Sequence, residues 1–273
     1  MDLCTEWVRV TAGASAALPA YLARPARVES PLPAILVIQE IWGVDEHIQD
    51  VARRFATAGY VALAPDLYAH EGTRPDGLLP ARLEAVKGFL DSLPPRAWMQ
   101  PGERDAAMAR LPEPQRGEVA ATMGALFSPQ RDMGRYAADL VAAAGFLRAH
   151  PSCRGRRVGS TGYCMGGALS ALVACSDPEL AAAVIYYGAS PPVERLAAIR
   201  CPLLGLYGGE DARVSDGVPA FAEAMRAAGR SFAYHVYPGA PHAFFNDTRA
   251  SYHVESARDA WARTLTFFAE HLG

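Results

Sequence analysis

The sequence predicts an α/β protein with a mostly parallel central sheet flanked by helices. Short apolar runs of five to seven residues alternate along the chain with amphipathic helical patterns. In residues 34–38 every position is apolar, which is typical of a strand that is buried on both faces in a parallel sheet. A glycine-rich turn at residues 162–167 joins a third such run to a helix.

The individual elements follow from these two patterns. The predicted strands are 6–11, 18–23, 34–38, 60–64, 157–161, 181–187, 203–207 and 232–237. The first two can pair as a hairpin. The predicted helices with apolar residues three and four positions apart are 47–58, 132–149, 164–175, 214–228 and 252–272. Gly59 and Gly229 directly follow two of these helices, as expected for glycine at a helix C-terminus.

Residues 71–131 interrupt the alternation. This stretch holds eight of the 21 prolines and three short helical patterns, at 81–92, 103–111 and 116–127, with no strand pattern between them. It is too long for a plain connection. We therefore expect one domain spanning residues 1–273, in which 71–131 is a helical cap over the C-terminal edge of the sheet.

Composition and charge exclude several classes of protein. The net charge of −3 offers no basic surface for a phosphate backbone, so we expect no nucleic-acid partner. No apolar stretch reaches the roughly 20 residues that span a bilayer, and the N-terminal residues do not resemble a signal peptide. The five cysteines are odd in number and scattered, which favours free thiols in a reducing, cytoplasmic setting over disulfides or a structural zinc site.

The strongest local motif is Gly162-Tyr163-Cys164-Met165-Gly166-Gly167, between a predicted strand and a predicted helix. It has the form of a strand–turn–helix nucleophile turn, G-x-S-x-G, with cysteine in the serine position. Glycines two positions on either side would relieve a collision with facing backbone, and the helix N-terminus would favour a thiolate. The alternative is a buried, inert cysteine in a closely packed helix.

A nucleophilic thiol needs a base and an acid that orients it. Of the four histidines after Cys164, only His242 is predicted in a loop; His235 falls in a strand, and His253 and His271 fall in the last helix. Asp211 follows Gly208-Gly209 at the end of a buried strand, with Glu210 as the alternative acid. Nucleophile, acid and histidine then occur in the order found in α/β-hydrolases.

At this point the chain resembles the dienelactone hydrolases, also called carboxymethylenebutenolidases. The segments that carry the resemblance are Gln39-Glu40-Ile41-Trp42-Gly43, Pro65-Asp66-Leu67-Tyr68, the Cys164 turn, Tyr186-Tyr187-Gly188, Gly208-Gly209-Glu210-Asp211 and His242-Ala243-Phe244. They lie in residues 34–70 and 157–272, whereas 71–131 shows little resemblance.

The resemblance implies an α/β-hydrolase fold and hydrolysis of a lactone or ester through an acyl-enzyme on Cys164. It implies His242 as general base, Asp211 as its orienting acid, and the backbone N–H groups of Ile41 and Met165 as the oxyanion hole. In this family the glutamate that matches Glu40 contacts the resting thiol and helps to release its proton. Tyr187 is expected to line the pocket or to lie in the core.

Two positions depart from the family pattern. Asn246 stands where the founding enzymes have an arginine that binds the substrate carboxylate, and a neutral amide cannot make that charge-assisted contact. Ala243 stands where serine is frequent. The second substrate arginine of the family cannot be assigned within the longer cap; the candidates are Arg74, Arg82, Arg96 and Arg131. A carboxylate-bearing dienelactone is therefore not the expected substrate.

We thus expect a carboxylic-ester or lactone hydrolase that uses water as second substrate and needs no metal or organic cofactor. The motifs of nucleotide-binding proteins and of zinc proteases are absent from the sequence. The main alternative is a redox-sensing or ligand-binding protein on the same fold, in which Cys164 is oxidised and turns over no substrate. The oligomeric state is left open.

Overall fold

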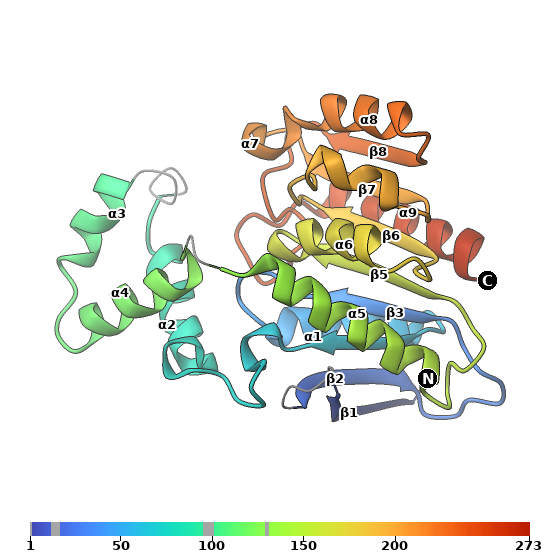
Figure 1. Cartoon of the computed structure of the whole chain (residues 1–273). Coiled ribbons are helices and arrows are strands. Elements are labelled where there is room, and N and C mark those ends of the chain that lie inside the picture. Colours follow the sequence, from blue (N-terminus) through green and yellow to red (C-terminus); the bar gives the residue numbers. More distant parts are fainter. Residues whose placement is uncertain (1, 12–16, 95–100, 129–130) are drawn as a thin grey trace. The chain divides into compact units, whose positions relative to one another are not determined.

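The computed structural model describes residues 2–11, 17–94, 101–128 and 131–273 (Figure 1). The chain divides into two compact units. The first comprises residues 1–72 and 133–273, and the second comprises residues 73–132.

The first unit is built on one eight-stranded sheet with the order β1-β2-β4-β3-β5-β6-β7-β8. These strands are β1 (Leu3–Val10), β2 (Leu18–Pro25), β3 (Ala34–Ile38), β4 (Val61–Pro65), β5 (Val158–Tyr163), β6 (Ala182–Tyr186), β7 (Leu203–Gly208) and β8 (Phe232–Tyr237). β1 and β2 form the expected antiparallel hairpin, and β2 also pairs antiparallel with β4. All other neighbours are parallel. This is the mostly parallel sheet of an α/β-hydrolase.

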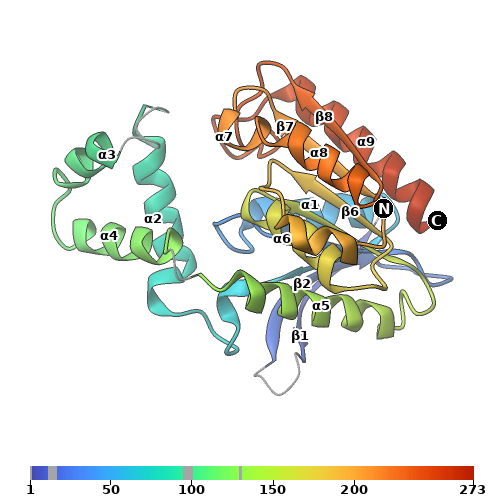
Figure 2. The same ribbon diagram turned by 45° about the horizontal axis from the view of Figure 1, so that its top comes forward.

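Helices cover both faces of the sheet, as Figures 1 and 2 show. α1 (Glu46–Thr57) and α9 (Val254–Leu272) lie on one face, and α5 (Met133–Ala149), α6 (Met165–Ser176) and α8 (Val218–Ala227) lie on the other. Phe55 of α1 and Phe268 of α9 are fully buried with ring centroids 5.9 Å apart, so the two helices share one core on their face of the sheet. In the described part of the chain, no helix has the length and apolar character needed to cross a membrane.

The parallel strands bring the candidate residues to one edge. Glu40 follows β3, Cys164 follows β5, Tyr187 follows β6, Asp211 follows β7 and His242 follows β8. Because the carboxyl ends of parallel strands meet at the same edge, residues that are far apart in the sequence are gathered there.

Two departures from the predicted helices lie near the candidate residues. The predicted helix 214–228 is two helices, α7 (Ala212–Ser215) and α8, because Pro219 lies in the first turn of α8 and has no N–H with which to continue an earlier helix. His253 lies just before α9 rather than inside it, and its side chain caps the helix by accepting from the Ser256 N–H.

The second unit is helical in its described residues. It contains α2 (Pro80–Asp91), α3 (Pro101–Met108) and α4 (Gln115–Leu126), and a 3-10 helix, η2, at Asp76–Leu78. Leu83, Val86 and Leu90 of α2 and Val119 and Leu126 of α4 are buried, and they form the apolar side chains around which this unit packs. Its role as a cap stays a prediction.

Candidate active site

Cys164 occupies a sharp turn between β5 and α6. Its backbone has φ 55° and ψ −114°, a conformation that residues other than glycine rarely adopt. Its N–H donates to the carbonyl of Tyr186 at 3.1 Å, which ties the turn to the neighbouring strand β6. A strained residue of this kind persists only where the surroundings hold it, and such residues cluster at functional sites.

The glycines of the turn are there because backbone passes too close for a side chain. A Cβ atom on Gly162 would lie 1.9 Å from the carbonyl oxygen of Gly166. A Cβ on Gly166 would lie 2.4 Å from the carbonyl oxygens of Ile38 and Gln39, and a Cβ on Gly167 would lie 2.6 Å from that of Tyr186. The expectation of a collision with facing backbone is confirmed.

His242 and Asp211 form the hydrogen bond that was expected of a base and its orienting acid. His242 Nδ1 and Asp211 Oδ2 are 2.5 Å apart, and the Asp211 side chain is buried. Glu210, the alternative acid, is exposed and its N–H donates to the carbonyl of Ala240. The structure therefore brings Asp211, and not Glu210, to His242.

The paired glycines before Asp211 let the His242 loop cross the end of β7. A Cβ on Gly208 would lie 2.5 Å from the carbonyl oxygen of Ala240 and 2.6 Å from that of Pro241. A Cβ on Gly209 would lie 2.9 Å from the carbonyl oxygen of Tyr237. These glycines thus permit the close approach that places His242 over Asp211.

The surroundings of His242 favour its protonated form. Burial lowers the pKa of His242, but hydrogen bonds to Asp211 and to Cys164 outweigh burial and raise the pKa to about 10. Since Nδ1 faces Asp211, the other ring nitrogen, Nε2, is the one available to Cys164. The structure therefore brings Cys164, His242 and Asp211 into one hydrogen-bonded series.

Three of the other four thiols are buried, unlike Cys164. Burial raises the pKa of Cys153 and of Cys201 to about 12, and it also raises the pKa of Cys175. Cys175 lies near the far end of α6, about 16 Å along the helix from Cys164 at 1.5 Å per residue. It is too distant to form a disulfide with Cys164 without rearrangement.

Glu40, Tyr187 and Asn246 form a second buried cluster. The Tyr187 hydroxyl donates to Glu40 Oε1 at 3.3 Å, and Asn246 Nδ2 donates to Glu40 Oε2 at 2.7 Å. All three side chains are at most 2% exposed, so the two neutral donors are what holds this carboxylate in the interior.

Tyr187 joins the two clusters. Its ring meets the His242 ring edge-on, with centroids 5.2 Å apart, while its hydroxyl is bonded to Glu40. Its backbone has φ 39°, another positive value outside glycine. Ala243, directly after His242, has φ 60°, so positive φ values occur both at the residue whose ring contacts His242 and at the residue that follows it.

Asn246 is occupied by protein contacts rather than turned outward. Its Oδ1 accepts from the N–H and the hydroxyl of Thr248, at 3.1 and 2.7 Å, while its Nδ2 is bonded to Glu40. Its carboxamide is therefore committed to holding Glu40 and the loop that follows His242.

Ile41 and Met165 lie on segments that touch each other. Met165 is the first residue of α6, where N–H groups point out of the helix N-terminus. Ile41 lies in the turn after β3, and the close approach of Gly166 to the Gln39 carbonyl joins that turn to the first turn of α6. Met165 thus adjoins Cys164 in the sequence, and Ile41 belongs to a segment that packs against the first turn of α6.

The candidate substrate arginines stay open. Arg74 donates to the carbonyl of Leu78 at 3.2 Å, and Arg82 pairs with Glu118 at 2.9 Å, so both have partners inside the second unit. Arg131 also belongs to that unit, and Arg96 lies outside the described residues.

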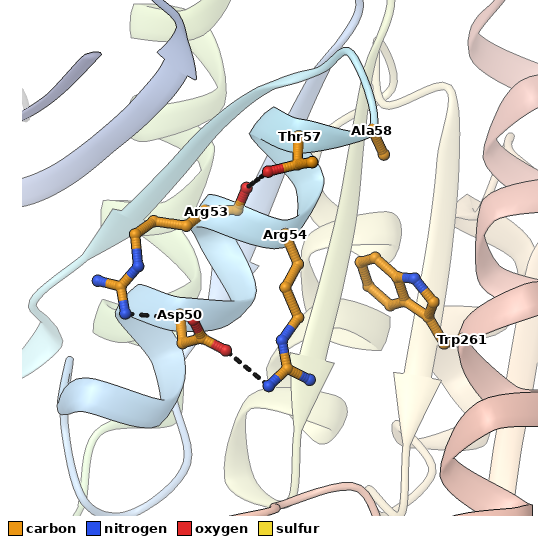
Figure 3. A pocket seen from close by; sticks show the side chains of 6 residues that line it. All are labelled: Asp50, Arg53, Arg54, Thr57, Ala58 and Trp261. Carbon is orange, nitrogen blue, oxygen red and sulfur yellow. Dashed lines mark hydrogen bonds and ion pairs between the residues drawn. The ribbon is translucent and has the colours of Figure 1, made fainter. Parts of the chain in front are cut away.

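A shallow groove elsewhere on the first unit has a different character. It lies between α1 and α9 and is lined by Asp50, Arg53, Arg54, Thr57, Ala58 and Trp261 (Figure 3). Arg53 pairs with Asp50 and Glu46, and Arg54 pairs with Asp50 and Asp247, so both cations are already neutralised. In the described ranges, no three His, Cys, Asp or Glu side chains gather closely enough to hold a metal ion.

The chain is similar over most of its length to proteins of one family. The sequence model of the Dienelactone hydrolase family matches residues 18–272. A protein of Saccharolobus solfataricus named "Putative carboxymethylenebutenolidase" is 36% identical over 254 residues, which are 92% of this chain and 93% of that protein. One of the same name from Escherichia coli K12 is 35% identical over 267 residues, covering 94% and 83% of the two chains.

A solved structure gives the same result. The crystal structure titled "Putative Dienelactone Hydrolase" from Klebsiella pneumoniae superposes with a TM-score of 0.75 at 32% identity, and covers 99% of this chain and 100% of that one. On the strength of these likenesses, the chain belongs to the dienelactone hydrolase family.

Proposed function

We propose that the protein hydrolyses small lactones or esters through a covalent acyl-enzyme on Cys164, with His242 and Asp211 completing the triad. The observation that carries this proposal is the strained Cys164 at the start of α6, bonded to a histidine that Asp211 holds at 2.5 Å. Family membership supports the reaction class.

The hydrogen bond of His242 to Cys164 supports transfer of the thiol proton to the imidazole as the sulfur attacks. The sulfur attacks the carbonyl carbon of the substrate, a C–S bond forms, and the carbonyl electrons move onto oxygen. The N–H groups of Ile41 and Met165 are the proposed donors to this oxyanion.

When the tetrahedral intermediate collapses, the C–O bond breaks and the alkoxide takes the proton from His242. A thioester on Cys164 remains. Water then attacks the thioester while His242 accepts a proton from it, and the C–S bond breaks. The products are a carboxylic acid and an alcohol, or a single hydroxy acid where the substrate is a lactone. Asp211 keeps Nδ1 protonated and stabilises the imidazolium in both halves of the cycle.

The committed Asn246 side chain supports an uncharged substrate. Its neutral amide donates to Glu40, so it offers no charge-assisted contact to a substrate carboxylate. Residues 71–131 are proposed as the cap over this site.

The test is hydrolysis of 4-nitrophenyl acetate, of the neutral lactone dihydrocoumarin and of a carboxylate-bearing butenolide by the purified full chain. We expect turnover of the neutral substrates, and a loss of about 10³-fold or more in Cys164→Ala. Cys175→Ala, the matched control, keeps wild-type activity. No turnover of any of the three, with Cys164 still reactive toward iodoacetamide, would favour the redox-sensing alternative.

A further inference from the structure

The Pro65-Asp66-Leu67-Tyr68 motif has no part in the triad, yet it forms a tightly bonded turn directly after β4. Asp66 Oδ1 accepts from the Tyr68 N–H at 3.2 Å and so caps the 3-10 helix η1 (Leu67–Ala69). The Asp66 N–H donates to the carbonyl of Pro19 on β2 at 2.8 Å. Asp66 and Tyr68 are each 6% exposed. The motif therefore builds a fixed, buried turn beside the end of β3.

Two hydrogen bonds join this turn to the segment that carries Ile41. The Leu67 N–H donates to Gln39 Oε1 at 3.1 Å, between buried groups. The Tyr68 hydroxyl donates to the carbonyl of Ile41 at 2.7 Å. The second bond is the shorter one, and it acts on the residue whose N–H is the proposed oxyanion donor.

The N–H of Ile41 lies in the peptide unit between Glu40 and Ile41. The carbonyl of that unit accepts from the Gly43 N–H at 3.4 Å, which is a long and weak bond. On one side of the unit the Glu40 carboxylate is held by Asn246. On the other side the Ile41 carbonyl is held by Tyr68. The direction of the Ile41 N–H thus depends on these two anchors, because its own turn bond is weak.

The ring of Tyr68 is held in turn from α5. Tyr136 of α5 packs against it edge-on, with centroids 6.5 Å apart. Two residues after Tyr68, His70 Nδ1 lies 2.7 Å from Oδ2 of Asp139, a buried carboxylate on the same helix. Both contacts fix η1 against α5, so the Tyr68 hydroxyl has little freedom to leave Ile41.

We infer that Tyr68 is a positioning residue for the oxyanion hole: by donating to the Ile41 carbonyl, its hydroxyl keeps the Ile41 N–H aimed at the oxygen on which charge develops. This inference rests on the proposed function, because it needs an acyl-transfer reaction at Cys164. A preorganised donor acts mainly in the transition state, so its misalignment lowers kcat more than it raises KM.

The experiment compares wild type, Tyr68→Phe and Tyr21→Phe with two reagents. Tyr21→Phe is the matched control, since Tyr21 is also 6% exposed and its hydroxyl bonds to Arg53, away from Ile41. Hydrolysis of 4-nitrophenyl acetate builds an oxyanion. In the alkylation by iodoacetamide, the Cys164 sulfur attacks a saturated carbon and no oxyanion forms. The second reaction therefore reports the reactivity of the thiol without the oxyanion hole.

For Tyr68→Phe we expect kcat and kcat/KM to fall together by about 10- to 100-fold, less than the loss of a whole oxyanion donor. KM and the rate of Cys164 alkylation stay within twofold of wild type, and Tyr21→Phe behaves as wild type in both reactions. A kcat within twofold of wild type would overturn the inference. An alkylation rate that falls by the same factor as kcat would also overturn the inference, because a parallel loss indicates that the whole site is disrupted.

Cys164→Ala separates the two proposals. Hydrolysis retained in Cys164→Ala overturns the proposed function and the positioning role with it. An inactive Cys164→Ala beside a fully active Tyr68→Phe overturns the positioning role alone.

Discussion

At the scale of single residues, the site depends on a few buried polar groups with specific partners. Asn246 is the clearest example, because sequence comparison alone suggests a neutral substitute for a substrate-binding arginine. In the structure its amide donates to Glu40 and its oxygen accepts from Thr248. The contact with Thr248 is local, of the kind that asparagine makes two residues on, but the contact with Glu40 joins residues 206 positions apart, and no local pattern predicts it.

The thiols are expected to differ in reactivity. Cys164 is partly exposed and bonded to His242, whereas burial raises the pKa of Cys153 and Cys201 to about 12. At pH 8 a thiol of pKa 12 is ionised to only about one part in 10⁴, and the thiolate is the reactive form. Timed alkylation with iodoacetamide and peptide mapping by mass spectrometry should label Cys164 before these two. Equal rates at all five cysteines would count against an activated nucleophile.

Asn246→Asp is expected to destabilise the fold in a pH-dependent way. An aspartate there places a second buried carboxylate against Glu40, and two such groups cannot both ionise. The pKa of the shared site is therefore raised in the folded state, and the unfolding free energy falls as pH rises above about 4. Urea unfolding should show the variant about 1–3 kcal/mol less stable than wild type at pH 7. The difference should narrow toward pH 4.5; a constant difference would contradict this account.

The raised pKa of His242 is expected to stabilise the folded protein at low pH. Its folded pKa of about 10 exceeds its unfolded value of 6.5, so the folded protein binds the proton more tightly. The stabilisation is present in full below about pH 6.5 and is lost as pH rises through 10. Compared with His242→Gln at each pH, wild type should lose unfolding free energy between pH 6.5 and 10. Parallel stability profiles for the two proteins over that range would exclude the raised pKa.

At the scale of elements, the turns between strands and helices, and not the strands themselves, fix the positions of the candidate site residues. The turn from β5 to α6 holds Cys164 at positive φ, and it is possible only because Gly162 and Gly166 lack a Cβ. These requirements are visible in the sequence, because glycine at fixed spacing is a local signal. The turn after β4 carries no comparable signal for its bond to Ile41, since that contact joins residues 27 positions apart.

Gly162→Ala should therefore cost far more than an ordinary helix substitution. The new methyl group would lie 1.9 Å from the Gly166 carbonyl oxygen, and backbone on both sides cannot move away. We expect the unfolding free energy to fall by more than about 3 kcal/mol. The matched control is Gly145→Ala in α5, where a Cβ meets nothing within 4 Å. That variant should be about 0.5–1 kcal/mol more stable than wild type. Similar thermal melts for the two variants would refute the steric argument.

At the scale of the whole molecule, hydrophobic patterning predicted the sheet and its helices well. Fully apolar runs such as 34–38 became buried parallel strands, and the order of strands and helices led to the correct fold class. The prediction of a single helix over 214–228 was wrong, because Pro219 has no N–H to donate and a second helix therefore begins there. The proline content of residues 71–131 predicts an insertion, but their apolar spacing does not predict which surface they contact.

The site was predictable to the extent that its residues follow strands. Cys164, Asp211 and His242 each come after a strand of one parallel sheet, so their meeting follows from topology. The Glu40–Tyr187–Asn246 cluster and the bonds of Tyr68 and of His70 depend on side-chain directions within the packed edge. Such directions arise only once the sheet is assembled.

The central claim is that Cys164 becomes acylated during turnover. The most direct test is rapid acid quenching of the protein during hydrolysis of 4-nitrophenyl acetate, followed by peptide mapping by mass spectrometry. We predict an acetyl group on Cys164 that forms as fast as the initial burst of nitrophenol and is absent from Cys164→Ala. Steady turnover with no acetyl group on Cys164, or with undiminished rate in Cys164→Ala, would contradict the account.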